Sequence, residues 1–178
     1  MISKSRQKLP YRRTCEGYLF YDGKVLARFI GKIDFPKKSF LMFPGGGMDK
    51  RETPEEALRR EVLEETGAIL EENLECLEKI YFDWDENWAK TEKQRKRYKV
   101  YRGEEMHIFR GEIVKLVRPR GDPSDVWKGK KFMEIDEAIR LINTARTSSS
   151  DMKKYLRIQL REMKRFKEMQ LKHLRRLR

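Results

Sequence analysis

The sequence predicts a single domain of the α/β class, and three observations lead to this prediction. The chain has 178 residues, which fits one domain at about 100–200 residues per domain. Runs of β-branched and aromatic residues alternate with segments of helical periodicity. Hydrophobic residues make up 38% of the chain, and they form no continuous run that would span a membrane.

The first elements are predicted to be strands. Residues 18–21 and 24–30 are β-prone and flank an Asp-Gly pair, the strongest short signal for a β-hairpin. A third apolar run, residues 40–43, meets Pro44 and then three glycines. Because glycine is favoured where the backbone needs unusual freedom, we expect this strand to stop at Pro44.

A helix is predicted next, because its start and stop signals are complete. Thr53 can act as the N-cap, Pro54 occupies the first helical position, and Glu56 completes a capping box with Thr53. Gly67 supplies the C-terminal stop. Two apolar residues with helical spacing provide a buried stripe, Leu58 and Val62.

Two further strands and two further helices are expected. The strands cover residues 74–84 and 106–117, and the helices cover residues 136–143 and 151–178. Between the two strands, residues 90–102 are strongly basic and are predicted to form a solvated loop or insertion. The last helix is amphipathic, so its apolar stripe is expected to pack on the domain, on a partner or on a second copy in a homodimer.

Positive charge is concentrated in two segments. The chain carries 42 Lys and Arg residues against 29 Asp and Glu residues, a net charge of +13. Residues 90–102 contribute +6 and residues 151–178 contribute +8, so the rest of the chain is close to neutral. This segregation favours anionic partners, and RNA bound through the two segments is one of them.

The sequence also predicts a cytoplasmic protein. Cys15 and Cys76 are the two cysteines, and so distant a pair makes neither a disulfide framework nor a metal knuckle. Residues 1–13 form a basic N-terminal arm without an apolar run, so no secretory signal is expected. A membrane partner is not expected either.

Glutamates on the predicted helix form a candidate metal site. Glu61, Glu64 and Glu65 lie at i, i+3 and i+4 and therefore project from one helix face. Like charges at this spacing destabilise a bare helix, and a bound cation would relieve them. Hard oxygen ligands select Mg²⁺, with Mn²⁺ as a substitute. The upstream glycines let a backbone carbonyl approach the same ion, and Arg60 could hold Glu52 in place.

The segment over residues 46–68 resembles the Nudix box. It reads glycine, five residues, glutamate, seven residues and then Arg-Glu-Val-Leu-Glu-Glu-Thr-Gly-Ala. Every fixed residue of the box is present, and Ala68 stands where the family prefers a larger aliphatic residue. A solvated acidic helix would not explain the glycines and the arginine at these distances. The resemblance extends over residues 14–146 and implies the Nudix fold, a mixed β-sheet sandwiched between helices, followed here by a long basic C-terminal helix at residues 151–178.

The resemblance implies an Mg²⁺-dependent hydrolase that cleaves a diphosphate linkage in a nucleotide-type substrate by attack of water on phosphorus. The metal would be held by four residues of the box, Gly46, Glu61, Glu64 and Glu65. Arg60 would support these ligands. Family members take the general base either from the box or from a later loop, where Glu104 and Glu105 are the candidates and Glu105 is preferred.

Aromatic residues after the box are the candidates for substrate binding. Trp84 and Tyr81 could stack on a nucleobase, although core packing is the alternative for each ring, and Arg28 is the third candidate. The substrate itself stays open. One alternative function is an RNA 5′-end pyrophosphohydrolase or decapping enzyme. Another is a non-catalytic polyanion-binding module, which we would expect to lack one of the box glutamates, whereas none is missing.

Overall fold

The computed structural model describes residues 6–30, 40–129, 131–145, 147 and 149–176. Its strands are β1 (Tyr11–Tyr21), β2 (Lys24–Leu26), β3 (Arg28–Ile30), β4 (Phe40–Met42), β5 (Gly45–Gly47), β6 (Ala68–Leu70), β7 (Glu75–Asp83), β8 (Gly103–Leu116) and β9 (Phe132–Glu134). Its α-helices are α1 (Pro54–Thr66), α2 (Glu92–Val100), α3 (Ile135–Thr144) and α4 (Ser150–Arg176). Two single-turn 3₁₀ helices are also present, η1 (Arg6–Lys8) and η3 (Glu86–Trp88).

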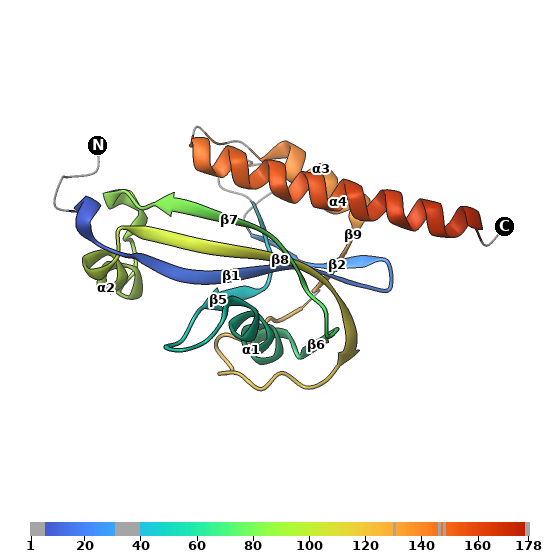
Figure 1. Ribbon diagram of the computed structural model, residues 1–178, viewed down its shortest axis with the longest axis horizontal. Coiled ribbons are helices and arrows are strands. Elements are labelled where there is room, and N and C mark those ends of the chain that lie inside the picture. Colours follow the sequence, from blue (N-terminus) through green and yellow to red (C-terminus); the bar gives the residue numbers. More distant parts are fainter. Residues whose placement is uncertain (1–5, 31–39, 130, 146, 148, 177–178) are drawn as a thin grey trace.

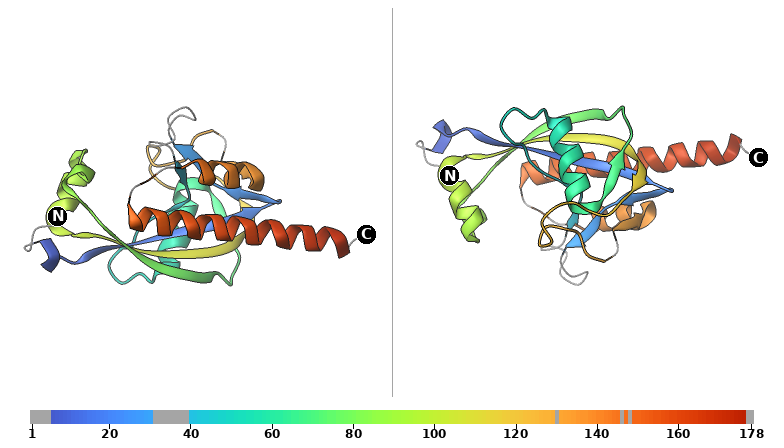
Figure 2. Two further views of the ribbon diagram at one scale, coloured as in Figure 1. Left: turned by 90° about the horizontal axis from the view of Figure 1, so that it is seen from above. Right: turned by 90° about the horizontal axis from the view of Figure 1, so that it is seen from below.

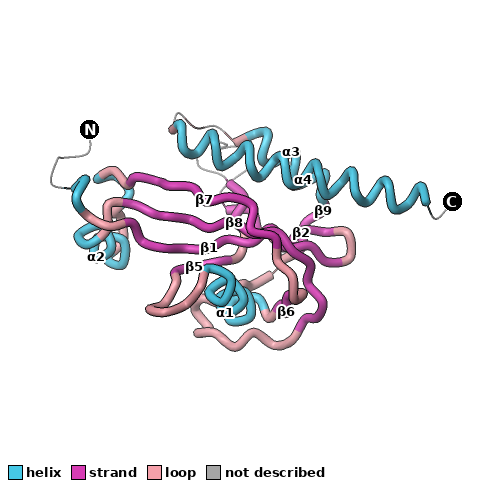
Figure 3. The backbone as a smooth tube through the Cα atoms, viewed as in Figure 1, coloured by secondary structure: helices cyan, strands magenta, loops and turns pink. Residues whose placement is uncertain are grey.

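A mixed sheet forms the centre of the domain (Figures 1 and 3). The long strands β1 and β8 are parallel neighbours, paired from Tyr11 with Gly103 to Phe20 with Glu112. Strands β6 and β7 pair antiparallel with β8, while β2 and β5 pair antiparallel with β1, and β9 extends the sheet beyond β2. Strands β3 and β4 form a separate antiparallel pair.

Helices cover both faces of this sheet. Helices α3 and α4 lie on one face and α1 lies on the other, as the views in Figures 1 and 2 show. Successive residues of β1 face opposite sides, so Tyr18 and Phe20 join the core beneath α3 and α4, whereas Leu19 joins the core beneath α1. The predicted α/β class, with a mixed sheet sandwiched between helices, is confirmed.

The predicted hairpin is confirmed, but its second arm is interrupted. Asp22 and Gly23 have φ values of 47° and 75°, the left-handed conformations that a two-residue turn needs, and β2 then pairs with β1. After Ala27 the chain leaves the sheet, and β3 pairs with β4 instead. The arm expected over residues 1–13 is also shorter, because residues 11–13 begin β1, where they pair with β8; residues 1–5 lie outside the described residues.

The strand expected to stop at Pro44 is followed directly by another. Residues 45–47, the glycines, form β5 and pair antiparallel with β1 opposite Thr14, Cys15 and Glu16. The preceding strand does end before Pro44, and Gly45 has a φ of 152° with no room for a Cβ against β1, so the predicted need for glycine is confirmed; that the glycines themselves form a strand was not predicted. Pairing to the long strand β1 supplies the hydrogen bonds that keep the glycines extended, and no local sequence signal reports that pairing.

Helix α1 has the predicted ends. Thr53 and Glu56 form the reciprocal capping box, Pro54 begins the helix, and Gly67 ends it in the left-handed conformation at φ 75°. Ala57, Leu58, Val62 and Thr66 are buried.

The basic segment over residues 90–102 is not a loop, because helix α2 occupies most of it. Thr91 and Gln94 form a second capping box at its start, and Glu92 and Lys96 make an i,i+4 ion pair at 2.9 Å. Lysine, arginine and glutamine are good helix formers, so caps and propensity outweigh the repulsion between cations. No residue of α2 is buried.

Helix α4 packs on the domain through most of its length. Tyr155, Ile158 and Met163 belong to the core beneath it, and the ring of Phe166 stacks on that of Phe20 with centroids 3.7 Å apart. Toward its C-terminal end the helix extends past the sheet (Figure 1), and Leu171 is 45% exposed. Within the described residues, no helix is both long enough and apolar enough to cross a membrane.

Candidate active site

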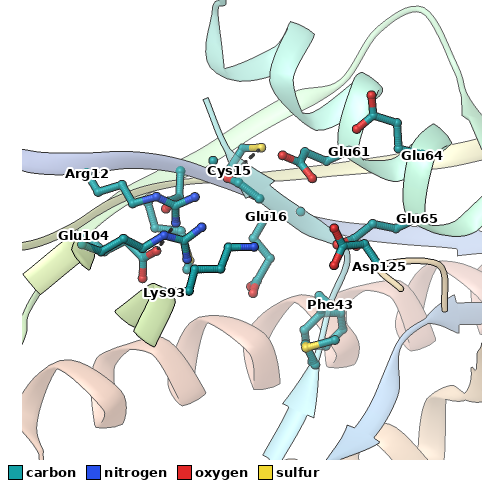
Figure 4. A pocket seen from close by; sticks show the side chains of 17 residues that line it. Arg12, Cys15, Glu16, Phe43, Glu61, Glu64, Glu65, Lys93, Glu104 and Asp125 are labelled. Carbon is teal, nitrogen blue, oxygen red and sulfur yellow. Dashed lines mark hydrogen bonds and ion pairs between the residues drawn. The ribbon is translucent and has the colours of Figure 1, made fainter. Parts of the chain in front are cut away.

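A cavity of about 460 Å³ lies between α1, α2 and the sheet. Its floor comes from β1 and from the glycine strand β5, and its two ends carry opposite charges. Figure 4 shows the acidic side chains of α1 on one side and Arg12 and Lys93 on the other, with Cys15 and Glu16 between them. The cavity therefore brings together residues from the beginning, middle and later parts of the chain.

The acidic wall contains all three glutamates that helical spacing placed on one face. Glu61, Glu64 and Glu65 line the cavity, and Asp125 from a later loop joins them. The Glu61 carboxylate packs against Gly46 so closely that a Cβ at that position would overlap it. A side chain at position 46 would therefore displace the Glu61 carboxylate from its present position.

Arg60 fixes the geometry of this wall. Its Nε and Nη2 atoms donate to the two carboxylate oxygens of Glu52 at 2.7 and 2.9 Å. Its Nη1 donates to Glu61 at 3.1 Å and to Glu64 at 3.2 Å, and Nη2 also donates to the carbonyl of Gly47 at 3.0 Å. Hydrogen bonds from Arg60 lower the pKa of Glu52 to about 2. One guanidinium thus ties the β5 backbone to three carboxylates of the box.

Glu65 occupies a different environment from its neighbours. Burial, together with the negative charge of Glu61, raises its pKa to about 7. Arg28 opposes this shift from nearby, but its guanidinium lies 4.8 Å from the centre of the Trp127 ring. Arg28 does not line the cavity, so the structure places this predicted substrate-binding residue outside it.

The donor chemistry of the acidic wall fits a hard divalent cation. Three carboxylates and the Gly46 backbone share one cavity, and hard oxygen ligands select Mg²⁺ or Mn²⁺. The Gly46 carbonyl oxygen lies 3.7 Å from Cys15 Sγ. Among the described residues, no three His, Cys, Asp or Glu side chains already converge as a metal-binding group; Glu61 and Glu64 are hydrogen-bonded to Arg60.

The opposite wall is basic and was not predicted. Arg12 from β1 and Lys93 and Arg97 from α2 line the cavity. Glu104 also lines this end, where its carboxylate accepts a hydrogen bond from Arg12 Nη1 at 3.1 Å. The excess of basic residues over residues 90–102 was visible in the sequence, but only the helical spacing of Lys93 and Arg97 could have indicated a shared face.

Glu105, the preferred candidate for the general base, does not reach the cavity. Its carboxylate contacts His107 Nε2 at 2.9 Å and Lys79 Nζ at 3.7 Å. Glu104, the neighbouring residue, lines the cavity instead. Side chains alternate between the faces of a strand, so the choice between two consecutive glutamates depends on the register of β8, which the sequence does not reveal.

A second, largely apolar cavity of about 530 Å³ adjoins the first. The rings of Trp84 and Trp88 stack with centroids 3.6 Å apart, and both line this cavity together with Phe82. Tyr81, predicted with Trp84 as a substrate-binding residue, lines neither cavity. It is 43% exposed and packs against Tyr11 at 4.9 Å between ring centroids.

Four residues line both cavities, so the two are parts of one cleft: Glu16, Met42, Glu104 and Met106. Glu16 is buried, and Tyr155 Oη donates to its carboxylate at 2.5 Å. Burial raises the pKa of Glu16 to about 8. This pair was missed, because 139 positions separate its members in the sequence and a single acidic residue within a strand carries no local signal.

The comparisons with known proteins agree with this architecture. The chain is similar to a NUDIX hydrolase from Nitrosomonas europaea, with 20% identity and a TM-score of 0.52 over 78% of this chain and 82% of that one. It is also similar to the MutT protein from Methanosarcina mazei Go1, with 16% identity and a TM-score of 0.52 over 87% of this chain and 96% of that one.

At these identities the two structures establish a shared fold. No curated protein gave a significant match. The family model of the NUDIX domain matches residues 17–156, which include the box, the second half of β1, all of β8 and the start of α4. By this match and by its fold, the chain belongs to the Nudix hydrolase family.

Proposed function

We propose that this protein is an Mg²⁺-dependent pyrophosphohydrolase that cleaves a diphosphate linkage in a nucleotide-type substrate. The observation that carries the proposal is the composition of the cleft. Glu61, Glu64 and Glu65 share one cavity with the Gly46 backbone, and a cavity lined by aromatic side chains opens from it. In a substrate with a diphosphate and an attached ring system, the diphosphate matches the metal-binding cavity and the ring system matches the aromatic cavity.

Gly46, Glu61, Glu64 and Glu65 are the proposed metal ligands. A bound Mg²⁺ or Mn²⁺ would neutralise the diphosphate and lower the pKa of the attacking water. Arg60 is proposed as a positioning residue, because it contacts Glu61, Glu64 and the Gly47 carbonyl but is itself a cation. Its five donors keep the carboxylates oriented in one direction.

The reaction itself needs a proton acceptor in the cleft. Water attacks one phosphorus, the bond from that phosphorus to the bridging oxygen breaks, and the departing phosphate takes the electron pair. The water proton passes to a carboxylate that lines the cavity, either a glutamate of the box or Glu104. Glu104 replaces Glu105 in this role because only Glu104 faces the cavity.

The apolar cavity is proposed to hold the nucleoside. Trp84 is buried and stacked on the half-buried Trp88, and both rings line the cavity with Phe82. Aromatic rings bind bases by stacking with little dependence on the base. Glu16, at the junction of the two cavities, adds a buried polar group.

The proposal is tested by phosphate and pyrophosphate release from a panel of substrates. The panel contains nucleoside triphosphates, dinucleoside polyphosphates, nucleotide sugars, ADP-ribose and 5′-triphosphorylated or capped RNA. Each is assayed with Mg²⁺, with Mn²⁺ and with a chelator. We expect turnover of a nucleotide substrate that the chelator abolishes. Folded protein that is silent across the panel would overturn the proposal and favour a polyanion-binding module.

The RNA arms of the panel also test the alternative based on the basic tail. Several cations of α4 are engaged by the domain itself, since Lys154 pairs with Glu78 at 3.0 Å and Arg165 with Glu75 at 3.5 Å. Deleting α4 would remove part of the core. Neutralising the exposed Arg157 and Lys164 is therefore the sharper test, and loss of RNA binding would support the alternative.

A further inference from the structure

Helix α2 directs two cations into the active-site cavity. Lys93 and Arg97 are four residues apart, so they lie on one face of the helix, and both line the cavity that contains the box glutamates. In Figure 4 the Lys93 side chain extends from the helix into this space. Arg12 reaches the same end of the cavity from β1.

Lys93 and Arg97 differ from Arg95 and Lys99 of the same helix because they line the cavity; some cations nearby are paired with carboxylates. Lys96 on the same helix pairs with Glu92 at 2.9 Å, and Arg102 pairs with Asp83 at 3.1 Å. Throughout the described parts of the chain, no carboxylate lies within ion-pair distance of Lys93 or Arg97. Partial burial of an unpaired guanidinium costs desolvation free energy, and a bound anion would offset that cost.

The surroundings of Arg97 disfavour its positive charge. The side chain is half-buried, and burial together with the charge of Arg12 lowers the pKa of its guanidinium. Glu104 is the carboxylate shared at this end, and it is hydrogen-bonded to Arg12. At this end of the cavity three cations therefore lie near one carboxylate, and the charge of Glu61 from the acidic wall also acts on Arg97.

The acidic wall and the basic wall of the cavity suit different phosphate groups of one substrate. With a divalent cation on the glutamates, the acidic wall binds the reacting diphosphate, and the basic wall is left free for a further anionic group. We propose that Arg12, Lys93 and Arg97 bind a phosphate beyond the reacting diphosphate, so that the preferred substrate carries a linear triphosphate rather than a diphosphate joined to a neutral group. The identity of the reacting diphosphate rests on the proposed function, whereas the phosphate site does not.

The site is tested first without catalysis. Inorganic tripolyphosphate is titrated into the full chain by calorimetry in the presence of a chelator. The variant Lys93→Gln/Arg97→Gln removes both α2 cations from the cavity, and Arg95→Gln/Lys99→Gln is the matched control. The control removes the same charge from the same helix at residues that line neither cavity. Glutamine keeps helix propensity in both variants, and circular dichroism checks their folding.

We expect the cavity variant to bind tripolyphosphate at least about tenfold more weakly, since charge-assisted hydrogen bonds to phosphate are lost. The control should change affinity by less than about twofold, because exposed charges act weakly at physiological salt. Unchanged affinity in the cavity variant would overturn the site. An equal loss in both variants would also overturn it, because it would show a general effect of net charge.

Steady-state kinetics with Mg²⁺ then test selectivity. The cavity variant should raise KM for a nucleoside triphosphate about tenfold with little change in kcat, while KM for ADP-ribose stays within about threefold. An equal rise for both substrates would overturn the assignment to a third phosphate. If no substrate is turned over, the proposed function fails, and the calorimetric result still decides whether the phosphate site exists.

Discussion

Helices α1 and α2 begin in the same way and face the same cavity, yet the fold holds them differently. Both start with a reciprocal capping box, at Thr53 and at Thr91. Helix α1 buries four residues against the sheet, whereas α2 buries none. Glu61 and Glu64 of α1 are held by Arg60, and the basic side chains of α2 that reach the cavity have no carboxylate partner among the described residues.

The difference matches the two proposed roles: α1 carries the metal ligands, and α2 carries the cations that select the substrate. Metal ligands need fixed positions, and a helix packed into the core with a tethering arginine provides them. Cations that recognise a phosphate tolerate movement, because a charge acts over several ångströms.

The largest effect is expected when the proposed metal ligands on α1 are neutralised. Glu64→Gln and Glu65→Gln each remove a proposed ligand charge at constant size. We expect kcat to fall by about 10³-fold, since a metal ligand set contributes several kcal/mol to the transition state. Glu55→Gln on the same helix lies outside the cavity and is the control. Near-normal turnover in both variants, with unchanged melting temperature, would contradict the metal assignment.

Removing the tether should have a smaller effect. In Arg60→Ala the contacts with Glu52, Glu61, Glu64 and the Gly47 carbonyl are lost together, and we expect kcat to fall about 10–100-fold, as for other residues that orient metal ligands. Arg59→Ala tests the neighbouring arginine, which contacts Glu55 and backbone carbonyls away from the cavity. A higher Mg²⁺ concentration for half-maximal rate is expected in Arg60→Ala alone, because misoriented carboxylates bind the metal more weakly. Equal losses in the two variants would indicate damage to the helix as a whole.

Glu16, on the cavity floor between the two helices, should make the stability of the protein depend on pH. The folded pKa of Glu16 is about 8 against an ordinary value of 4.5, so between these values the folded carboxyl retains a proton that the unfolded carboxyl has lost. Its contribution to stability is complete below the ordinary pKa and is lost as pH rises through about 8.

Glu16→Gln removes this titration. Relative to this variant, the wild type should therefore lose free energy of unfolding as pH rises from about 5 to about 8. Chemical denaturation of both proteins across this range gives the difference directly. Tyr18, Tyr155 and Glu104 act on Glu16 and remain in both proteins, so two parallel curves would show that Glu16 is ionised in the folded state.

The smallest expected effect comes from removing the N-cap of each helix, and it compares α1 with α2 directly. Thr53→Ala and Thr91→Ala remove equivalent caps, each worth about 1 kcal/mol to its helix. Because α1 is part of the core, Thr53→Ala should lower the global free energy of unfolding by about this amount. Thr91→Ala should leave the global value unchanged and accelerate amide hydrogen exchange within α2. Equal global losses would show that α2 unfolds only together with the domain.

Much of the fold followed from local signals. The turn at Asp22 and Gly23 and both ends of α1 are where the sequence places them. Strands β6 and β9 were missed, because three residues are too few to show a periodicity. The basic segment was assigned to a loop because its charge outweighed a capping box that was equally visible at Thr91 and Gln94.

The candidate site was predicted on one side only. Glu61, Glu64, Glu65 and Arg60 lie on one helix and follow its repeat, so their proximity could be inferred. The basic wall, the choice of Glu104 over Glu105 and the Glu16–Tyr155 contact depend on elements far apart in the sequence. Tyr81 and Trp84 are both aromatic residues near the end of the same predicted strand, yet only Trp84 lines the cleft.

The sequence by itself therefore determined the carboxylate face, its arginine and the helix that carries them, because caps and side-chain spacing act over three or four residues. The tertiary structure decided what that face meets. The register between β1 and β8 places Glu104 and Arg12 side by side, the pairing of β5 with β1 brings Gly46 to Glu61, and α2 brings Lys93 to the same cavity. These contacts depend on long-range packing and strand pairing, whose energies no local pattern encodes.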